Sequence, residues 1–329
     1  MKIVVTGASG HLGINLIRAI IAGGGEVRAL THHNNTGLEK LDIDLVNGDV
    51  LDVNTLNHAF EGADQVYHLA GYISLLVSDW AACSAVNVEG TRNVVNACRQ
   101  AGVKRLVHFS SIHAFCQEPF AIPIDESRNF VDVKKAPAYD RSKAMGEQLV
   151  RKAIEEGLDA VIINPTAIIG PYDYRPSHTG QAIIQMATGR LPVLVDGGFD
   201  WVDARDVAQG AIRSAEIAPA GSRYLLSGHW LSLKALAGIV SSVSGVRAPA
   251  FVCPIGIANL CAPLVTFSAH LAGRRPIYTT GSLKAVISNR DTRHDKATAE
   301  LGYAPRPLEE TIRTTVAWFK ENGYLRSNK

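Results

Sequence analysis

This chain has little net charge and no closely spaced pair of cysteines. It also shows no sequence typical of an N-terminal targeting segment. Its 33 basic and 31 acidic residues leave a net charge of +2, so no overall field favours nucleic acid or an anionic surface. The five cysteines are scattered and form no Cys-x-x-Cys pair, which disfavours a disulfide framework and a zinc site and fits reduced thiols. The N-terminus runs directly into a β-branched stretch, which leaves no room for a signal peptide. We therefore expect a cytoplasmic protein that binds neither a metal nor nucleic acid.

A long uncharged stretch is the exception in an otherwise evenly charged sequence. Residues 248–273 contain no Asp, Glu, Lys or Arg, and the stretch is just long enough to span a bilayer. Three prolines, Pro263 among them, interrupt it, and Asn259 and His270 lie inside it. This composition favours a buried or interfacial helical lid over a spanning helix, and it leaves peripheral association with a membrane open.

The first thirteen residues predict a nucleotide site. Residues 2–6 form a β-branched run that predicts a strand, and apolar residues recur at helical spacing from residue 12 onward. Between them, Gly7 permits a tight turn, Gly10 lets a pyrophosphate approach the backbone, and Gly13 allows the helix to pack closely on the strand. The helix N-terminus would offer its free N–H groups to the phosphates. The alternative is a purely structural glycine turn, because the spacing is a variant of the usual fingerprint.

Strands and helices alternate through the first half of the chain. This alternation implies right-handed crossovers and an α/β fold with a parallel, doubly wound Rossmann sheet. Beyond Pro165, prolines, glycines and aromatics crowd residues 170–201, which predicts loops. We expect strands at 26–31, 42–48, 64–69, 104–110, 160–164 and 224–227, and helices at 52–60, 81–101, 137–154, 205–218 and 232–244. We assign 1–164, with 202–228 returning to it, to a dinucleotide-binding core, and 165–201 and 229–329 to a smaller C-terminal substrate cap.

A tyrosine, a lysine and a serine form the candidate catalytic group. Tyr139 and Lys143 are four residues apart and share one face of a predicted helix. A free phenol titrates near pH ~10, and a neighbouring ammonium favours the phenolate and brings its pKa toward neutrality. Ser111 follows the predicted strand 104–110, where its hydroxyl would lie over the cofactor crevice. A chance Tyr/Lys pair and a serine that caps a turn are the alternatives. The order of glycine turn, serine and Tyr/Lys pair is that of a dehydrogenase/reductase.

This order of motifs resembles the extended short-chain dehydrogenase/reductase family over nearly the whole chain, most closely its dihydroflavonol-reductase-like and 3β-hydroxysteroid-dehydrogenase-like members. The resemblance implies that Tyr139 is the acid/base, that Lys143 lowers its pKa and holds the nicotinamide ribose, and that Ser111 orients the substrate oxygen. It rests on residues 6–13, 48–50, 68–71, 87–91, 110–111, 139–143, 164–165 and 202–207. The implied cofactor contacts are Gly7, Ser9, Gly10, His11, Leu12, Gly13, His32, Asp49, Val50, Leu69, Ala70, Gly71, Asn87, Tyr139, Lys143 and Pro165.

Two departures from the family pattern bear on the cofactor and the substrate. The family often has an arginine where His32 stands, and Ala114-Phe115-Cys116 replaces its usual Val-Tyr-Gly. The carboxylate that would bind the ribose 2′-hydroxyl of NAD is missing from the end of the second strand, which favours NADP over NAD.

The expected substrate is a mainly apolar small molecule. Residues 196–203 carry no Arg or Lys for the diphosphate of a sugar nucleotide, and residues 72–77 and 248–273 are apolar enough to line a cavity. The alternative is that these two segments only pack on each other. We expect an NAD(P)-dependent oxidoreductase that interconverts a carbonyl and a hydroxyl by hydride transfer. An NAD-dependent sugar-nucleotide epimerase or dehydratase is the alternative, and a homodimer is left open.

Overall fold

A seven-stranded parallel sheet forms the centre of the computed structural model, which describes residues 1–32, 34–74, 79–271 and 279–325. The strand order is β10-β6-β5-β4-β1-β2-β3, so the doubly wound Rossmann fold is confirmed. The β-branched and aliphatic residues of β1 and β4–β6 are buried on both faces, as expected where helices cover both sides. The strands are β1 Lys2–Thr6, β2 Glu26–Thr31, β3 Asp44–Asn47, β4 Gln65–His68, β5 Arg105–Phe109, β6 Ala160–Pro165 and β10 Arg223–Leu226.

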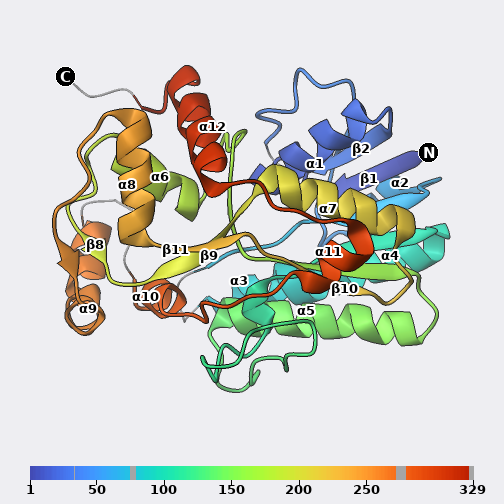
Figure 1. Cartoon of the computed structure of the whole chain (residues 1–329). Coiled ribbons are helices and arrows are strands. Elements are labelled where there is room, and N and C mark those ends of the chain that lie inside the picture. Colours follow the sequence, from blue (N-terminus) through green and yellow to red (C-terminus); the bar gives the residue numbers. More distant parts are fainter. Residues whose placement is uncertain (33, 75–78, 272–278, 326–329) are drawn as a thin grey trace.

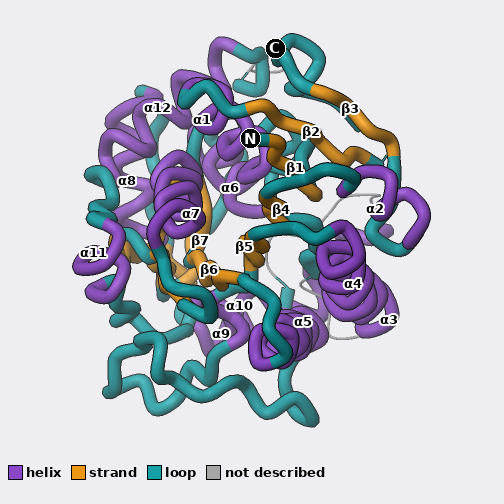
Figure 2. Tube along the Cα trace, turned by 90° about the vertical axis from the view of Figure 1, so that its right-hand side faces the viewer, coloured by secondary structure: helices purple, strands orange, loops and turns teal. Residues whose placement is uncertain are grey.

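Helices cover both faces of this sheet (Figure 2). On one face α1 (His11–Ala22) and α7 (Ala204–Ile217) pack against each other and against the strands. On the other face lie α2 (Val53–Phe60), α4 (Thr91–Ala101) and α5 (Ala138–Glu155). The single helix expected at 81–101 is instead three consecutive segments, because a π-helical turn interrupts it. These are α3 Trp80–Ser84, the π-helix η1 Ala85–Gly90 and α4.

A second layer of elements lies beside the carboxyl ends of β6 and β10 (Figure 1). It contains a three-stranded sheet in the order β11-β9-β7 and a two-stranded sheet of β8 and β12, with five helices around them in the described part of the chain. Its strands are β7 Ala167–Ile169, β8 Leu194–Val195, β9 Gly198–Asp203, β11 His229–Ser232 and β12 Val252–Cys253. Its helices are α6 His178–Ala187, α8 Leu233–Ser244, α9 Ile255–Leu271, α10 Thr280–Val286 and α12 Leu308–Glu321.

The prediction of loops over residues 170–201 was wrong, because α6, β8 and part of β9 lie there. Ser177 caps α6 by accepting a hydrogen bond from the backbone N–H of Gly180 at 3.1 Å. The carboxylate of Asp173 holds Ser177 in turn, through its N–H at 2.8 Å and its hydroxyl at 2.7 Å. Apolar residues of α6 then pack against α8 and α12. The prolines of this stretch all lie in the connections between these short elements, whereas Gly180 lies within α6.

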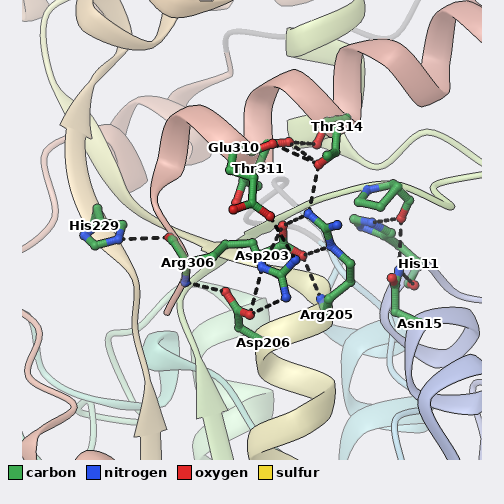
Figure 3. Close-up of polar contacts among 12 residues, drawn as sticks. His11, Asn15, Asp203, Arg205, Asp206, His229, Arg306, Glu310, Thr311 and Thr314 are labelled. Carbon is green, nitrogen blue, oxygen red and sulfur yellow. Dashed lines mark hydrogen bonds and ion pairs between the residues drawn. The ribbon is translucent and has the colours of Figure 1, made fainter. Parts of the chain in front are cut away.

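Two aspartates tie the C-terminal part of the chain to the start of α7 (Figure 3). The side chain of Arg306 donates to one carboxylate oxygen of Asp206 at 2.7 and 2.9 Å. Asp203 is held by Arg205 at 2.6 Å, and Arg205 also reaches Thr314 of α12 at 2.8 Å. Burial alone would raise the pKa of Asp203, but the hydrogen bonds from Arg205 outweigh it and lower that pKa. We call these residues the Asp203/Asp206 clasp.

The segment that precedes Arg306 in the chain packs against the central sheet and its helices. Helix α11 (Asp295–Leu301) packs on α7 and β10, and its Ala297 and Leu301 are buried in the core cluster that contains α1. Lys296 donates to the backbone carbonyl of Arg223 in β10 at 3.1 Å. Within the described residues, no helix is both long and apolar enough to cross a bilayer.

Candidate active site

The turn after β1 forms a cradle that only glycine can build. Gly7 has a φ of +68°, and a Cβ there would lie 2.5 Å from the backbone nitrogen of Ala70. A Cβ on Gly13 would lie 2.4 Å from the carbonyl oxygen of Gly7, so α1 can approach β1 only without it. Thr6 ties the two strand ends together, because its hydroxyl accepts from the N–H of Ala70 at 3.2 Å. The turn is thus packed as closely as the sequence predicted for a pyrophosphate-binding loop, and its binding of a cofactor stays a prediction.

The N-terminus of α1 is open toward this cradle. Gly10 is its N-cap residue, no side chain caps it, and its first turn contains no acidic residue. Such a helix end offers N–H groups and a positive dipole end to an anion. The ring of His11 is hydrogen-bonded to the carbonyl of Pro171 at 3.1 Å (Figure 3). Asn15 donates to the same carbonyl oxygen at 3.0 Å. A contact of His11 with the cofactor therefore stays a prediction.

The far end of the crevice lies at the carboxyl ends of β2 and β3. His32 is exposed, and its Nε2 lies 3.3 Å from the carboxylate of Asp49. Val50, next to Asp49, is buried, and a Cβ on Gly90 would lie 2.8 Å from its methyl carbon. A pocket of about 430 Å³ opens here, lined by Thr31, His32, Asn35, Leu45 and Asn47.

The three predicted catalytic side chains come together where β5 meets α5. Tyr139 and Lys143 lie on α5, and Ser111, which follows β5, is close enough to Tyr139 for its hydroxyl to lower the pKa of the phenol. The ammonium of Lys143 donates to the carbonyl of Phe109, the last residue of β5, at 2.6 Å. Both the serine and the lysine are thus fixed at the carboxyl end of one central strand.

The acidities of these groups differ from the simple expectation that Lys143 lowers the pKa of Tyr139. Burial raises the pKa of Tyr139 to about 12, and the nearby hydroxyl of Ser111 opposes this rise. Burial also lowers the pKa of Lys143 to about 8, while the carboxylate of Glu147 one turn further along α5 opposes this fall. The phenol therefore keeps its proton at neutral pH, because its burial dominates, while the ammonium of Lys143 is hydrogen-bonded to the carbonyl of Phe109.

A histidine and an aspartate missed by the sequence reasoning flank the tyrosine. The ring of His113 meets that of Tyr139 edge-on, with centroids 5.8 Å apart. Its Nδ1 lies 3.2 Å from a carboxylate oxygen of Asp140. Burial lowers the pKa of His113, but the charge and hydrogen bond of Asp140 outweigh burial and raise it. His113 and Asp140 are 27 residues apart in the chain, and nothing in the sequence predicts that they form a pair.

Asn87 lies in the π-helical turn and positions two neighbouring segments. Its side-chain amide accepts from the N–H of Tyr72 at 2.8 Å and donates to the Tyr72 carbonyl at 2.9 Å. The same amide donates to the hydroxyl of Ser142 on α5 at 2.8 Å. A Cβ on Gly146 would lie 2.5 Å from the Asn87 carbonyl, so α5 touches the turn directly. π-Turns often occur at functional sites, where they aim one side chain. The predicted contact of Asn87 with the cofactor is not tested by this geometry.

A buried ion pair of Glu147 and Arg223 is linked through Asn164 to the backbone of Ser111. Glu147 is fully buried and pairs with Arg223 of β10 at 3.0 Å. Asn164 of β6 donates to Glu147 at 2.7 Å and to the backbone carbonyl of Ser111 at 3.2 Å. The predicted Pro165 follows Asn164 directly and is the last residue of β6. A buried carboxylate of this kind needs such partners to remain charged.

The predicted substrate walls are described only in part. Tyr72 and Ile73 are exposed beside the site, and residues 75–77 of the same predicted wall lie outside the described residues. In the described chain no group of three His, Cys, Asp or Glu residues is arranged to hold a metal ion.

Comparisons with known proteins agree with this geometry. The sequence profile of the NAD dependent epimerase/dehydratase family matches residues 3–226. The chain is 33% identical to the sterol demethylase protein B of Methylococcus capsulatus over 99% of this chain and 100% of that protein. It is 31% identical to a putative dihydroflavonol 4-reductase of Synechocystis over 98% of this chain and 96% of that protein. The crystal structure of gox2253 is similar with a TM-score of 0.86 and 32% identity, covering 99% of each chain.

Proposed function

Because the chain belongs to the NAD dependent epimerase/dehydratase family, the extended short-chain dehydrogenases/reductases, we propose that Tyr139, Ser111 and Lys143 reduce a carbonyl on a mainly apolar molecule. The observation that carries this proposal is their convergence at the end of β5, beside the glycine cradle. NAD(P)-dependent oxidoreductase chemistry of this family is established by the relatives, and the residue roles and the substrate are what we propose.

Tyr139 acts as the proton donor to the substrate oxygen. Its pKa of about 12 keeps it protonated at neutral pH, which suits the reductive direction. The hydroxyl of Ser111 lies close to that of Tyr139, so a carbonyl oxygen bound between them would receive a second hydrogen bond from Ser111. The hydride for the carbonyl carbon would come from a reduced nicotinamide held beside these side chains.

Lys143 holds the cofactor ribose. Its ammonium is anchored on the carbonyl of Phe109 at 2.6 Å and has two further N–H donors to offer toward the crevice. We assign the phosphates to the cradle of Gly7, Ser9, Gly10, Leu12 and Gly13, and the walls around the nicotinamide to Leu69, Ala70, Gly71 and Pro165. The same division assigns residues 1–164 and 202–228 to cofactor binding and the remainder to the substrate cap, although α11 of that remainder packs on α7 and β10 of the core.

NADP is the proposed cofactor form. The described residues that line the pocket at the ends of β2 and β3, His32, Asn35 and Asn47 among them, include no Asp or Glu, and the nearby carboxylate of Asp49 is paired with His32. Asp49, 3.3 Å from His32, would face the adenine. NADPH and NADH should both raise the melting temperature, and NADPH should do so at the lower concentration. His32→Asp should reverse that order, and an unchanged order would contradict the assignment.

The substrate is proposed to be an apolar ring system. Arg205 and Arg306, two cations near the cap, are bound to Asp203 and Asp206 and so are not available to a diphosphate. A diphosphate that met only these two paired arginines would lose its hydration and gain little in return. The two relatives described above are named for a sterol and a dihydroflavonol, which are largely apolar ring systems.

The deciding experiment is a paired screen with purified protein. One arm offers apolar ketones and aldehydes with NADPH and NADH, followed by absorbance of the reduced cofactor. The other arm offers UDP-, GDP- and dTDP-sugars with NAD, followed by product analysis. We expect turnover of apolar carbonyls. Turnover of a nucleotide sugar alone would replace the reductase proposal by an epimerase or dehydratase.

A further inference from the structure

The outer face of α9 is apolar, and the proposed reaction does not use it. Ala258 and Ala262 turn inward and pack with Val195 and Leu283. On the opposite side, Ile257, Leu260 and Leu264 follow one another at helical spacing and are 54%, 80% and 73% exposed. Phe251, just before β12, is 60% exposed. Figure 1 shows α9 at the outer end of the cap, beside α10.

The sequence around this face carries only positive charge. Residues 217–290 contain no Asp or Glu, although acids and bases nearly balance over the whole chain. Every charged side chain in that span is basic, so the cap carries a charge that the net value of +2 conceals. The basic residues of the span are Arg223, Lys234, Arg247, Arg274, Arg275, Lys284 and Arg290.

Two of these cations are exposed in the described structure, on segments that adjoin α9 in packing or in the chain. Lys284 is exposed on α10 and directly follows Leu283, which packs on α9. Arg247 is exposed in the segment that leads through β12 into α9. Within the described chain neither side chain has a carboxylate partner, whereas Arg205 and Arg306 are both paired.

We propose that Phe251, Ile257, Leu260 and Leu264, with Arg247 and Lys284, form a surface that docks on an anionic lipid bilayer. We call it the α9 surface. The helix would lie in the headgroup region with its apolar side chains below the phosphates and the cations among them. No helix of the described chain is suited to cross the bilayer, so the association is peripheral.

Charge decides between a bilayer and a second copy of the chain. Two copies meeting through this face would bring basic segments of the same sign together, which opposes association. Anionic headgroups complement the same segments. A protein docked in this way would take up an apolar substrate dissolved in the membrane, and this consequence alone rests on the proposed function.

The test is flotation of the full-length protein with phosphatidylcholine vesicles, with and without phosphatidylserine. We expect binding to the vesicles that contain phosphatidylserine, and weaker binding at raised salt. Leu260→Gln should weaken partitioning by about tenfold or more. Ile217→Gln, which alters an exposed apolar residue at the end of α7, should have no effect. Arg247→Gln with Lys284→Gln should remove the preference for phosphatidylserine.

Cys261 gives an independent readout, because it is exposed on the α9 surface. Its reaction with a maleimide should slow several-fold on vesicles with phosphatidylserine, while that of the partly exposed Cys116 should not. Each variant should keep the melting shift caused by NADPH, which shows that it is folded independently of membrane binding. Absence of vesicle binding would overturn the proposal. So would a dimer in sedimentation that Leu260→Gln converts to a monomer, since the face would then join two copies.

Discussion

Lys143 donates a hydrogen bond of 2.6 Å to the backbone carbonyl of Phe109, so its charge lies against the end of β5. Burial nevertheless lowers the pKa of this ammonium to about 8, which means that folding makes protonation of the side chain less favourable. The charged form of Lys143 therefore reduces the stability of the fold at the position where cofactor and substrate are expected to meet. Stability given up in this way is typical of active sites.

The first prediction concerns removal of that charge. Lys143→Met should abolish turnover and weaken cofactor binding, yet raise the free energy of unfolding at pH 7 by about 1–3 kcal/mol. Between the folded pKa of about 8 and the unfolded value of about 10.4, the unfolded chain binds more protons, so wild-type stability rises with pH. That rise should be smaller in the variant. Urea unfolding at pH 7 and 10 measures it, with exposed Lys152→Met as the matched control.

The second prediction concerns the proton donor. Tyr139→Phe should lower kcat by at least about a hundredfold, because only the donor hydroxyl is lost. The dissociation constant of NADPH, measured by its fluorescence, should change little. Ser111→Ala should lower kcat less, since Tyr139 keeps its proton. Residual activity of Tyr139→Phe above a few per cent would show that another group supplies the proton.

The third prediction concerns two buried histidines beneath the site. Burial lowers the pKa of His68 to about 3 and that of His108 well below its usual value, so both are neutral when folded. The unfolded chain protonates them below pH about 6.5, and each should reduce stability by about 1.4 kcal/mol per pH unit on further acidification. His108→Phe should remove one such contribution, and it also eliminates a buried ring nitrogen without a partner in the described structure. Exposed His58→Phe is the control, and an unchanged slope for His108→Phe would contradict this account.

The fourth prediction concerns the histidine beside Tyr139. Asp140→Asn should lower the pKa of His113, measured by NMR, because burial then acts without the opposing carboxylate. In the wild type the folded pKa is raised, so the stabilisation is present below the unfolded value and is lost as pH rises through the folded value. Its size should be below about 1 kcal/mol, since the ring is partly exposed. Glu155→Gln at the far end of α5 should leave the pKa of His113 in place.

Local patterns were enough for much of the core. The strand predicted at 26–31 is β2, and the helix predicted at 137–154 differs from α5 by one residue at each end. Asp52 caps α2 by accepting from the N–H of Asn54 at 2.9 Å, because a short acidic side chain before an apolar run can do so in any context.

Tertiary contacts account for what the sequence missed. The amide of Asn87 in the π-turn bonds both Tyr72 and Ser142, which lie 15 and 55 residues away in the chain. In the sequence, Glu147 is an ordinary helix residue. Its buried ion pair with Arg223 forms only because β10 lies beside it in the fold. The acidity of Tyr139 likewise depends on how deeply α5 is packed, which the Tyr/Lys spacing does not encode.

The Asp203/Asp206 clasp has a consequence for the order of events during synthesis. Arg306 follows Asp206 by 100 residues, so the ribosome completes every strand of the central sheet before the cation of Asp206 exists. A nascent chain halted before residue 306 would hold Asp206 without its arginine and α7 without the segment that crosses its first turn. Folding of the nascent cofactor-binding part should therefore remain reversible until Arg306 has emerged from the ribosome.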